Sequence, residues 1–332
     1  MKIAFFEIQG WEKPILKKGL PKQNLTFYQE PLSLKNISLA KNSEIISPFI
    51  YSKINQTLIS SLPKLKLITT RSTGFDHLDL KACQKKKIAV ANVPFYGENT
   101  VAEHTFALIL ALSRNIHKSY LRTLRNDFSI EGLKGFDLKG KTLGVIGAGH
   151  IGLQVIKIAK GFGMKVLVSD AKPNKLLSET LGFTYYSLKD LLGRSDIISL
   201  HAPLIPKTHH LINKKNIKLI KKGALLINTA RGGLVDTEAL INALDKKILF
   251  GVGLDVMEGE ELIKEEKQLL YDKQKMASLS NLVKDHILLS KDNVVYTPHI
   301  AFYSQEALER IMETTVENIT AFISGKPQNL VI

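Results

Sequence analysis

The stretch GKTLGVIGAGHIG, residues 140–152, decides the fold of this chain. Its β-branched part, Thr142–Ile146, predicts a strand, and a helical pattern follows directly after the last glycine. Between the two lies the spacing Gly147-x-Gly149-x-x-Gly152, which is a weak signal alone because glycines are common in turns. Flanked by a strand and a helix, it predicts a dinucleotide-binding turn, with a purely structural glycine turn as the alternative.

Each glycine of this turn has its own expected role. Gly147 permits the tight turn, Gly149 lets the backbone approach a pyrophosphate, and Gly152 allows close packing of the helix on the strand. The helix expected over Leu153–Gly161 directs free N–H groups and the positive end of its dipole at the phosphates.

Asp170 discriminates between the two nicotinamide dinucleotides. It ends the next predicted strand, 18 residues beyond Gly152. Its carboxylate can accept hydrogen bonds from the ribose 2′-OH of NAD but would repel the 2′-phosphate of NADP. Because Ala171 rather than an arginine follows it, we expect NAD, although Lys172 leaves NADP open.

Outward from this stretch, short apolar segments alternate with amphipathic ones along the chain, a pattern typical of parallel sheets with crossover helices. We expect strands at 142–147, 164–170, 196–201, 224–230, 250–256 and 294–298, and in the first hundred residues at 2–8, 43–49, 65–70 and 87–93. The sequence therefore predicts an α/β fold of two doubly wound parallel-sheet domains, a Rossmann NAD-binding domain inserted into a smaller flavodoxin-like domain.

A strongly apolar helix is expected between the two series of strands. The segment ENTVAEHTFALILAL (98–112) has Asn99 or Thr100 near its cap, and every residue of Phe106–Leu112 is apolar. More than one face of this helix must therefore be covered. It is either a helix between domains that can also reach a subunit interface, or the central helix of one large core.

The tail over 300–332 has a helical pattern but is too short to be a domain, so we expect it to pack on the first half. The expected domains are a substrate-binding domain of residues 1–100 plus 300–332 and an NAD-binding domain of residues 101–299.

The charge balance is basic. The 332 residues include 46 Lys and Arg against 31 Asp and Glu, a formal net charge of +15. Such a charge suggests a nucleic-acid binder, a protein that binds anionic surfaces, or an enzyme that attracts small anions. The basic residues are spread along the chain and their longest run is Lys85–Lys87, so we expect a solvated surface and no nucleic-acid partner. Nucleic-acid binding stays open as the weaker alternative.

The single cysteine, Cys83, can form neither an intramolecular disulfide nor a Cys-rich zinc site, and we expect a small buried residue in a reducing compartment. The N-terminal apolar stretch is interrupted at Glu7, too early for a signal-peptide core. The longest purely apolar run, Phe106–Leu112, is far shorter than the ~20 residues of a membrane span. We expect a cytoplasmic protein with no membrane partner and no metal.

Three ionisable residues, Arg231, Glu260 and His299, each follow a predicted strand of the second half. In a doubly wound sheet, ligands collect at the carboxyl ends of the strands. Each residue alone has an ordinary interpretation, as a surface ion pair, a solvated acid or a structural histidine. Together with a nicotinamide cofactor they suit the reduction of a 2-keto acid.

In that reaction Arg231 can bind the substrate carboxylate with its planar guanidinium and polarise the neighbouring carbonyl. Protonated His299 can supply a proton to the carbonyl oxygen as hydride arrives at the carbon, and neutral His299 can remove it in the reverse direction. A carboxylate beside His299 would favour the imidazolium and fix its orientation, which is the role we assign to Glu260.

Five long motifs occur in order: GKTLGVIGAGHIG (140–152), HAPLIPKTHHLIN (201–213), LLINTARGGLVDTEAL (225–240), FGVGLDVMEGE (250–260) and TPHIAFYS (297–304). On these motifs the chain resembles the D-isomer-specific 2-hydroxyacid dehydrogenase family over essentially its whole length. The resemblance implies that Arg231, Glu260 and His299 are the catalytic trio. It also implies cofactor contacts at His150, Ile151, Asp170, Ala202, Pro203, Thr208, Thr229, Ala230 and Asp255.

The resemblance further implies a substrate-carboxylate cradle in RSTGFDHLD (71–79), around Thr73 and Gly74. Taken alone, Gly74 is a plausible simple turn and Arg71 a surface cation. The loop NVPFYGENTVAEH would place the hydroxyl of Tyr96 over the substrate, where a loop packing role is the alternative.

The VPFY loop and the AFY after His299 are most similar to the D-lactate dehydrogenase subgroup. This implies pyruvate as substrate, D-lactate as product, a homodimer, and Phe302 as an aromatic wall near the substrate side chain. The 39 residues from Glu260 to His299 are more than in compact family members, and 261–287 is expected to be an exposed helical elaboration, a lid or a subunit contact.

The expected enzyme is thus an NAD-dependent oxidoreductase whose domains close on a small 2-keto acid. Phenylpyruvate, 4-methyl-2-oxopentanoate, hydroxypyruvate and 3-phosphohydroxypyruvate are alternative substrates. A non-catalytic NAD-sensing regulator is the alternative of another class, and an intact acid/base histidine argues against it.

Overall fold

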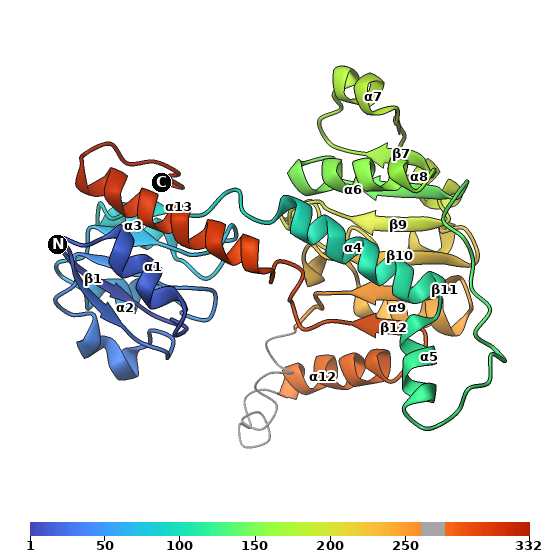
Figure 1. Ribbon diagram of the computed structural model, residues 1–332, viewed down its shortest axis with the longest axis horizontal. Helices are drawn as coiled ribbons and strands as arrows, with labels where there is room; N and C mark the ends of the chain where they lie inside the picture. Colours follow the sequence, from blue (N-terminus) through green and yellow to red (C-terminus); the bar gives the residue numbers. More distant parts are fainter. Residues whose placement is uncertain (260–275) are drawn as a thin grey trace. The chain divides into compact units, whose positions relative to one another are not determined.

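The computed structural model describes residues 1–259 and 276–332, with side chains for 1–259 and 283–332. It divides into two compact units (Figure 1). Unit 1 consists of Met1–Tyr96 and Tyr303–Ile332, and unit 2 is Gly97–Phe302. Unit 2 extends further in both directions than the NAD-binding domain expected over 101–299.

Unit 1 is built on a parallel sheet in the order β2-β1-β3-β4-β5, which is the flavodoxin-like order. Its strands are β1 (Lys2–Phe5), β2 (Asn24–Phe27), β3 (Ile45–Ser47), β4 (Leu67–Thr69) and β5 (Ala89–Ala91). The four strands expected in this half are confirmed. The strand β2 was not expected, because its sequence NLTF lacks the apolar run of a buried strand.

Helices cover both faces of this sheet. They are α1 (Glu12–Gly19), the 3₁₀ helix η1 (Leu34–Leu39), α2 (Gln56–Ser60), α3 (Leu80–Lys85) and α13 (Gln305–Ile323). One apolar core contains Ile46, Leu58 and Cys83. Burial raises the pKa of the Cys83 thiol to about 11, so this cysteine behaves as the buried apolar residue that was expected.

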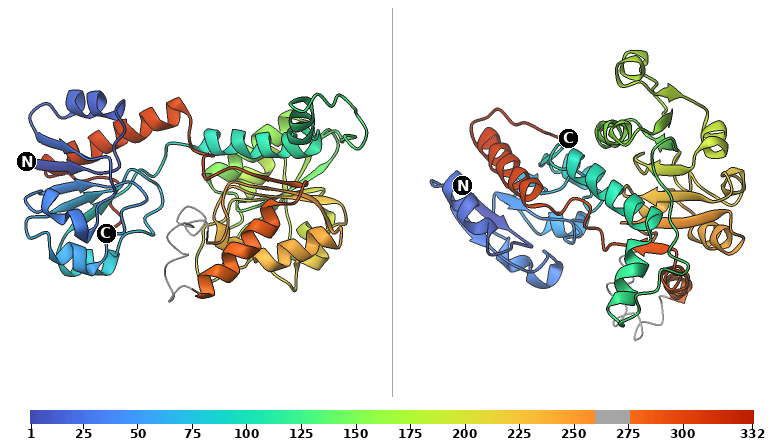
Figure 2. Two further views of the ribbon diagram at one scale, coloured as in Figure 1. Left: turned by 90° about the horizontal axis from the view of Figure 1, so that it is seen from below. Right: turned by 45° about the vertical axis from the view of Figure 1, so that its right-hand side comes forward.

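The C-terminal tail packs on the first half, as the sequence predicted. A Cβ added to Gly19 would lie 2.7 Å from a methyl of Val316, so α1 and α13 are in close contact, and Figure 2 shows α13 along the sheet of unit 1. Beyond α13 the chain extends the sheet edge, where the amide of Val331 donates to the carbonyl of Val90 at 2.7 Å. The Ala91–Leu330 bridge is antiparallel.

Unit 2 is built on a seven-stranded parallel sheet in the order β12-β11-β10-β9-β6-β7-β8. Its strands are β6 (Thr142–Ile146), β7 (Lys165–Ser169), β8 (Thr184–Tyr185), β9 (Ile197–Leu200), β10 (Ala224–Asn228), β11 (Leu249–Leu254) and β12 (Val294–Tyr296). All six expected strands are confirmed, and β8 was missed because two residues carry no periodic signal. The strand order reverses between β6 and β9, where a doubly wound sheet binds its ligand.

The helices of unit 2 are α4 (Glu98–Ser113), α5 (Ile116–Thr123), α6 (His150–Gly161), α7 (Lys175–Leu181), α8 (Leu188–Arg194), α9 (Thr237–Asp245) and α12 (Met276–Leu289), with 3₁₀ turns η2 (Ile217–Leu219) and η3 (Gly232–Leu234). They cover the two faces of the sheet (Figure 1). Successive strand residues serve opposite cores: Ile197 packs in the core of α4 and α6, and Ile198 in that of α8 and α9.

The apolar helix α4 belongs to the core of unit 2. It packs on β11, where a Cβ added to Gly253 would lie 3.0 Å from the Cβ of Leu108, so this strand needs glycine to admit the helix. The helix expected over 98–112 is confirmed as Glu98–Ser113; its N-cap is Gly97, and Asn99 and Thr100, expected near the cap, lie in the first turn. Thr100 is buried.

Arg71, for which a surface position was an alternative, is fully buried. Its guanidinium donates to the carbonyl oxygens of Ser47 at 2.8 Å and Phe6 at 2.7 Å, and its Nε lies 3.7 Å from a carboxylate oxygen of Glu12. A buried cation needs such partners because burial removes its hydration. Arg71 therefore ties together loops at the carboxyl edge of the unit 1 sheet.

Within the described residues, no helix has both the length and the apolar character that crossing a membrane requires. The elaboration expected over 261–287 lies largely outside the described residues, and its last part falls in α12.

Candidate active site

The carboxyl edge of the unit 2 sheet collects most of the residues that the sequence singled out. Because all strands of this sheet are parallel, the residues that follow them meet at one edge. The glycine turn follows β6, Asp170 follows β7, Ala202 and Pro203 follow β9, Thr229, Ala230 and Arg231 follow β10, Asp255 follows β11, and His299 follows β12.

Two glycines of the turn are required by close backbone approach. Gly147 has a φ of +95°, and a Cβ there would lie 2.7 Å from the carbonyl carbon of His201. A Cβ at Gly152 would lie 2.1 Å from the carbonyl oxygen of Gly147. Any side chain at either position would push the turn away from β9 or from α6.

The third glycine faces open space. Gly149 is the N-cap of α6, and a Cβ there would meet nothing within 4 Å. His150 and Ile151 form the first turn of α6, so the amide groups at this helix end are directed at an accessible volume. A bare helix N-terminus beside open space fits the pyrophosphate of a dinucleotide.

Asp170 lies beside this turn. Its carboxylate accepts hydrogen bonds from the amide of Ala148 at 2.6 Å and from the amide of Lys172 at 2.7 Å. These bonds hold a negative charge at the end of β7, where it can accept from a ribose hydroxyl and repel a phosphate. The residues present therefore fit NAD.

The other expected cofactor residues are engaged in local contacts. The hydroxyl of Thr208 donates to the carbonyl of Pro203 at 2.6 Å and accepts from the amide of Ile205 at 2.8 Å. Thr229 is buried, and its hydroxyl lies 2.9 Å from that of Thr105 on α4. These bonds shape the loops after β9 and β10, and direct contact with the cofactor stays a prediction.

Arg231 begins the turn that follows β10. Its Nη1 donates to the carbonyl of Ala230 at 2.8 Å, and the side chain of buried Asn228 donates to the carbonyl of Arg231 at 2.9 Å. The next residue is glycine of necessity, because a Cβ at Gly232 would lie 2.1 Å from the backbone of Met257. The Arg231 turn thus packs directly on the segment after β11.

Asp255 anchors the loop that carries His299. The Asp255 carboxylate, only 1% exposed, accepts from the amides of Ile300 and Ala301, each at 2.9 Å, and from the hydroxyl of Thr297. The amide of His299 donates to the Asp255 carbonyl at 2.9 Å, and the φ of His299 is +57°. The aspartate predicted as a cofactor contact therefore also fixes the backbone around the predicted acid/base residue.

His104, on α4, was not singled out from the sequence. Its Nε2 lies 2.9 Å from the hydroxyl of Thr297 and 3.5 Å from the carboxylate of Asp255. Burial lowers its pKa, and the nearby Asp255 charge opposes that shift. No spacing links position 104 to position 297, so only the fold could reveal this contact.

Glu260 lies outside the described residues, and its catalytic role stays a prediction. Glu258, two positions earlier, is described. Its carboxylate lies 2.8 Å from Nε2 of His210 and 3.7 Å from Nε2 of His209. Sequence analysis gave these three residues no role.

The expected substrate cradle lies in unit 1, after β4. The Thr73 hydroxyl donates to the carbonyl of Val93 at 2.8 Å, and the Ser72 hydroxyl donates to the carbonyl of Gly74 at 2.6 Å. The carbonyl of Tyr96, which follows β5, accepts from Arg310 on α13 at 2.6 Å. Phe302 is the last residue of unit 2. Contacts of these residues with substrate stay predictions.

The comparison with protein families gives one clear match. A sequence profile described as D-isomer specific 2-hydroxyacid dehydrogenase, NAD binding domain, matches residues 106–301. The matched segment lies within unit 2 and contains the glycine turn, Arg231 and His299.

Individual relatives are similar over nearly the whole chain. The D-lactate dehydrogenase of Escherichia coli is 35% identical, with 100% of each chain covered. A glyoxylate reductase of Thermococcus litoralis is 35% identical, covering 98% of this chain and 91% of its own. A crystal structure of D-lactate dehydrogenase from Aquifex aeolicus, complexed with NAD and lactic acid, has a TM-score of 0.87 at 42% identity and covers 98% of this chain and 96% of its own.

Proposed function

We propose that this chain, which belongs to the D-isomer specific 2-hydroxyacid dehydrogenase family, reduces pyruvate to D-lactate with NADH. The family makes the chain an NAD-dependent oxidoreductase that acts on a CH–OH group. The choice of pyruvate among 2-keto acids is the part that we propose. The observation that supports it is the similarity, at 42% identity, to the Aquifex aeolicus enzyme whose complex contains NAD and lactic acid.

NADH is held by the glycine turn, the first turn of α6 and Asp170. When bound, it supplies the hydride that reduces the carbonyl carbon of the substrate. Gly149 leaves room for the pyrophosphate and Asp170 accepts from the ribose. The protein thus contributes position and charge to that end of the site.

Arg231 binds the substrate carboxylate. A guanidinium can donate two parallel hydrogen bonds to a carboxylate, which fixes the orientation of the carbonyl next to it. The positive charge also stabilises the negative charge that develops on the carbonyl oxygen. The bonds between Asn228 and the Arg231 carbonyl, and between the Arg231 side chain and Ala230, hold the residue at the end of β10.

His299 donates the proton to that oxygen and removes it in the reverse reaction. The backbone of His299 is held by the Asp255 carbonyl, and the two following amides by the Asp255 carboxylate. Such anchoring fixes the backbone that carries the imidazole. Glu260 is the carboxylate that we propose to favour the imidazolium.

The substrate is tested by following NADH absorbance with a panel of 2-keto acids. We expect the highest kcat/KM for pyruvate, with lower values for glyoxylate, hydroxypyruvate, phenylpyruvate and 4-methyl-2-oxopentanoate. The His299→Ala variant should lose at least about 100-fold in kcat/KM, because general acid catalysis contributes ~10²–10⁴-fold. A D-specific lactate dehydrogenase should oxidise the product, and an L-specific one should not.

A preference for another acid, such as the glyoxylate named in the Thermococcus litoralis relative, would overturn the choice of pyruvate but not the dehydrogenase. Full activity of His299→Ala would overturn the acid/base assignment. NADH binding without turnover of any acid would favour an NAD-sensing regulator.

We also propose a homodimer. Helix α5 and the segment after it expose large apolar side chains, namely Ile116, Tyr120, Leu121, Leu124, Phe128 and Ile130, each more than half exposed. Several large exposed apolar side chains within one short segment are typical of a protein interface. A cytoplasmic location is proposed on the lone, buried thiol of Cys83 and is checked by cell fractionation.

A further inference from the structure

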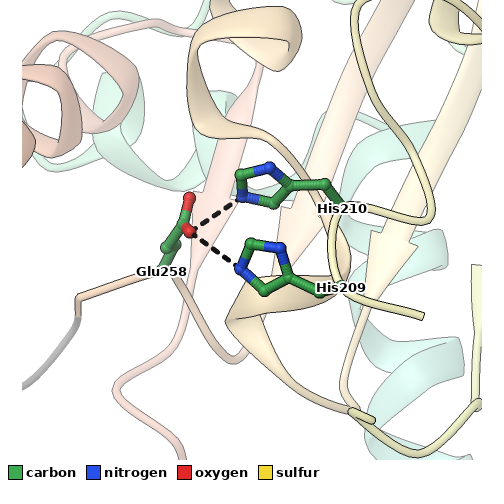
Figure 3. A group of neighbouring side chains, drawn as sticks. All are labelled: His209, His210 and Glu258. Carbon is green, nitrogen blue, oxygen red and sulfur yellow. Dashed lines mark hydrogen bonds and ion pairs between the residues drawn. The ribbon is translucent and has the colours of Figure 1, made fainter. Parts of the chain in front are cut away.

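We propose that His209, His210 and Glu258 form a binding site for one divalent transition-metal ion of the Zn²⁺ class (Figure 3). The proposal is independent of which 2-keto acid the enzyme reduces. Among the described side chains, this is the one group of three or more His, Cys, Asp or Glu residues whose donor atoms all lie within 4.8 Å of one another.

The donor atoms have spacings that a zinc ion can bridge. Zn²⁺ binds imidazole nitrogen and carboxylate oxygen at about 2.0–2.1 Å, so two tetrahedral ligand atoms lie roughly 3.3 Å apart. The Glu258 oxygen lies 2.8 Å from Nε2 of His210 and 3.7 Å from Nε2 of His209. One distance is shorter and the other longer than this value. Side-chain rotations that move the donor atoms by a few tenths of an ångström would bring both distances to about 3.3 Å.

The backbone brings the two imidazoles to the same side. Consecutive residues of an extended chain point in opposite directions, but His210 has a φ of +50°, and the two rings stack with centroids 4.0 Å apart. Non-glycine residues in this left-handed region are uncommon and strained. The conformation is fixed by the amide of His210, which donates to the carbonyl of Gly233 at 2.8 Å.

The third ligand comes from a segment held against the same turn. Glu258 follows Met257, whose backbone contacts Gly232 so closely that a Cβ on that glycine would lie 2.1 Å away. The histidine segment and the Glu258 segment therefore both pack on the residues directly after Arg231. These backbone contacts bring the three side chains to one place, where Glu258 pairs with His210 and the two imidazoles stack.

A second, buried carboxylate lies within electrostatic reach of Glu258. Asp285, on α12, is 1% exposed, and neither of its carboxylate oxygens accepts a hydrogen bond within the described part of the chain. The side chains of Glu258, His286 and Lys284 are the charged groups that act on it. A cation bound to Glu258 would lower the electrostatic cost of this buried acid.

The donor set selects the class of metal. Two imidazoles and one carboxylate suit Zn²⁺, Co²⁺, Ni²⁺ or Cu²⁺, whereas Mg²⁺ and Ca²⁺ prefer oxygen ligands throughout. Three protein ligands leave a coordination position for water. The side chains are 54%, 33% and 31% exposed for His209, His210 and Glu258, so an ion can reach them from solvent.

The test is a titration of the full chain, without a polyhistidine tag and freed of metal by a chelator, with ZnCl₂ in a calorimeter. We expect saturable binding of one ion per chain. Co²⁺ should give the intense visible absorption of a tetrahedral site, which is far stronger than the weak band of octahedral, solvated Co²⁺. Each of His209→Gln, His210→Gln and Glu258→Gln should weaken binding at least about tenfold, which corresponds to ~1.4 kcal/mol.

The matched control is His117→Gln. His117 is on α5, and its ring contacts the carbonyls of Ala111 and Asp292, at the opposite edge of the sheet from the proposed ligands. This variant should bind Zn²⁺ as the wild type does. Absence of saturable binding, or equal affinity in the wild type and all three ligand variants, would overturn the site. Circular dichroism of each variant establishes that the fold is intact.

Discussion

The single buried carboxylate of Asp255 accepts three hydrogen bonds from the loop that carries His299. It accepts from the amides of Ile300 and Ala301 and from the hydroxyl of Thr297, while its carbonyl accepts from the amide of His299. The buried amide of Ala301 and the partly buried amide of Ile300 would lose their acceptor if this side chain were removed. Unsatisfied buried donors cost about 1–3 kcal/mol each.

We therefore expect Asp255→Ala to lower the free energy of unfolding by about 2–4 kcal/mol and to reduce kcat/KM at least about tenfold, because His299 is no longer fixed. Urea denaturation and NADH-coupled kinetics measure the two effects. The matched control is Asp196→Ala, which removes a carboxylate bonded to the Thr142 amide at 2.8 Å and to Lys221 at 2.6 Å, at the amino edge of the sheet. The control should lose stability but keep kcat/KM, and equal kinetic losses in both variants would contradict the anchoring role.

At the scale of elements, the connection from β6 to α6 contains glycines that are needed for two different reasons. Gly147 has a left-handed φ and backbone atoms of His201 beside it, whereas Gly149 has an ordinary φ of −74° and open space. The first glycine serves the protein's own packing. The second leaves room for the ligand.

We expect Gly147→Ala to destabilise unit 2 and abolish NADH binding, because the alanine would be strained and would clash with the start of the β9 loop. Gly149→Ala should unfold at the wild-type temperature but bind NADH at least about tenfold more weakly, because the new methyl occupies the pyrophosphate site. NADH fluorescence measures the affinity for NADH, and thermal unfolding measures the stability of each variant.

The control for these variants is Gly161→Ala, at the end of α6, where a Cβ also meets nothing within 4 Å. It should leave NADH affinity unchanged. A Gly149→Ala variant with unaltered affinity would place the pyrophosphate elsewhere.

At the scale of the whole molecule, acid should destabilise both units. Burial lowers the pKa of His77 in unit 1 to about 4 and that of His201 in unit 2 to about 3. Each folded-state pKa lies below the unfolded value of about 6.5, so protons bind preferentially to the unfolded chain as the pH falls below 6.5. Each histidine then costs about 1.6 kcal/mol of stability between pH 6.5 and pH 5.

Asp285 acts in the opposite direction, because its raised pKa of about 6 makes the folded state take up a proton first, a gain of about 1 kcal/mol over the same interval. We expect a net loss of about 2 kcal/mol, measured by urea denaturation at the two pH values. His201→Asn should lose about 1.6 kcal/mol less than the wild type on acidification, and an unchanged pH dependence in that variant would contradict the assignment to His201.

The exposed apolar side chains of the α5 region predict self-association. We expect the wild type to have the mass of a dimer in light scattering, and Phe128→Ser combined with Leu124→Ser to shift it toward the monomer. The matched control is Leu176→Ser, on α7, which removes another exposed leucine and should leave the mass unchanged. A monomeric wild type would contradict the proposed homodimer.

Much of this architecture follows from local sequence. The strands of unit 2 are apolar runs of ordinary length, and Gly147, Gly149 and Gly152 occupy positions that only a tight strand-to-helix turn demands. Arg231, Asp255 and His299 follow strands, so parallel topology alone brings them to one edge. The strands β2 and β8 were missed because a polar edge strand and a two-residue strand have no period to detect.

What the sequence by itself determined is the alternation of apolar strands and helices, the dinucleotide turn and the family, because each of these depends on residues that are neighbours along the chain. Only the tertiary structure decided which distant residues meet. His104 contacts the loop of His299, Arg71 is buried among loop carbonyls, and His209 and His210 face Glu258. These contacts join segments from separate strands and helices, and their geometry depends on packing and on single backbone angles such as the φ of His210, which no linear spacing specifies.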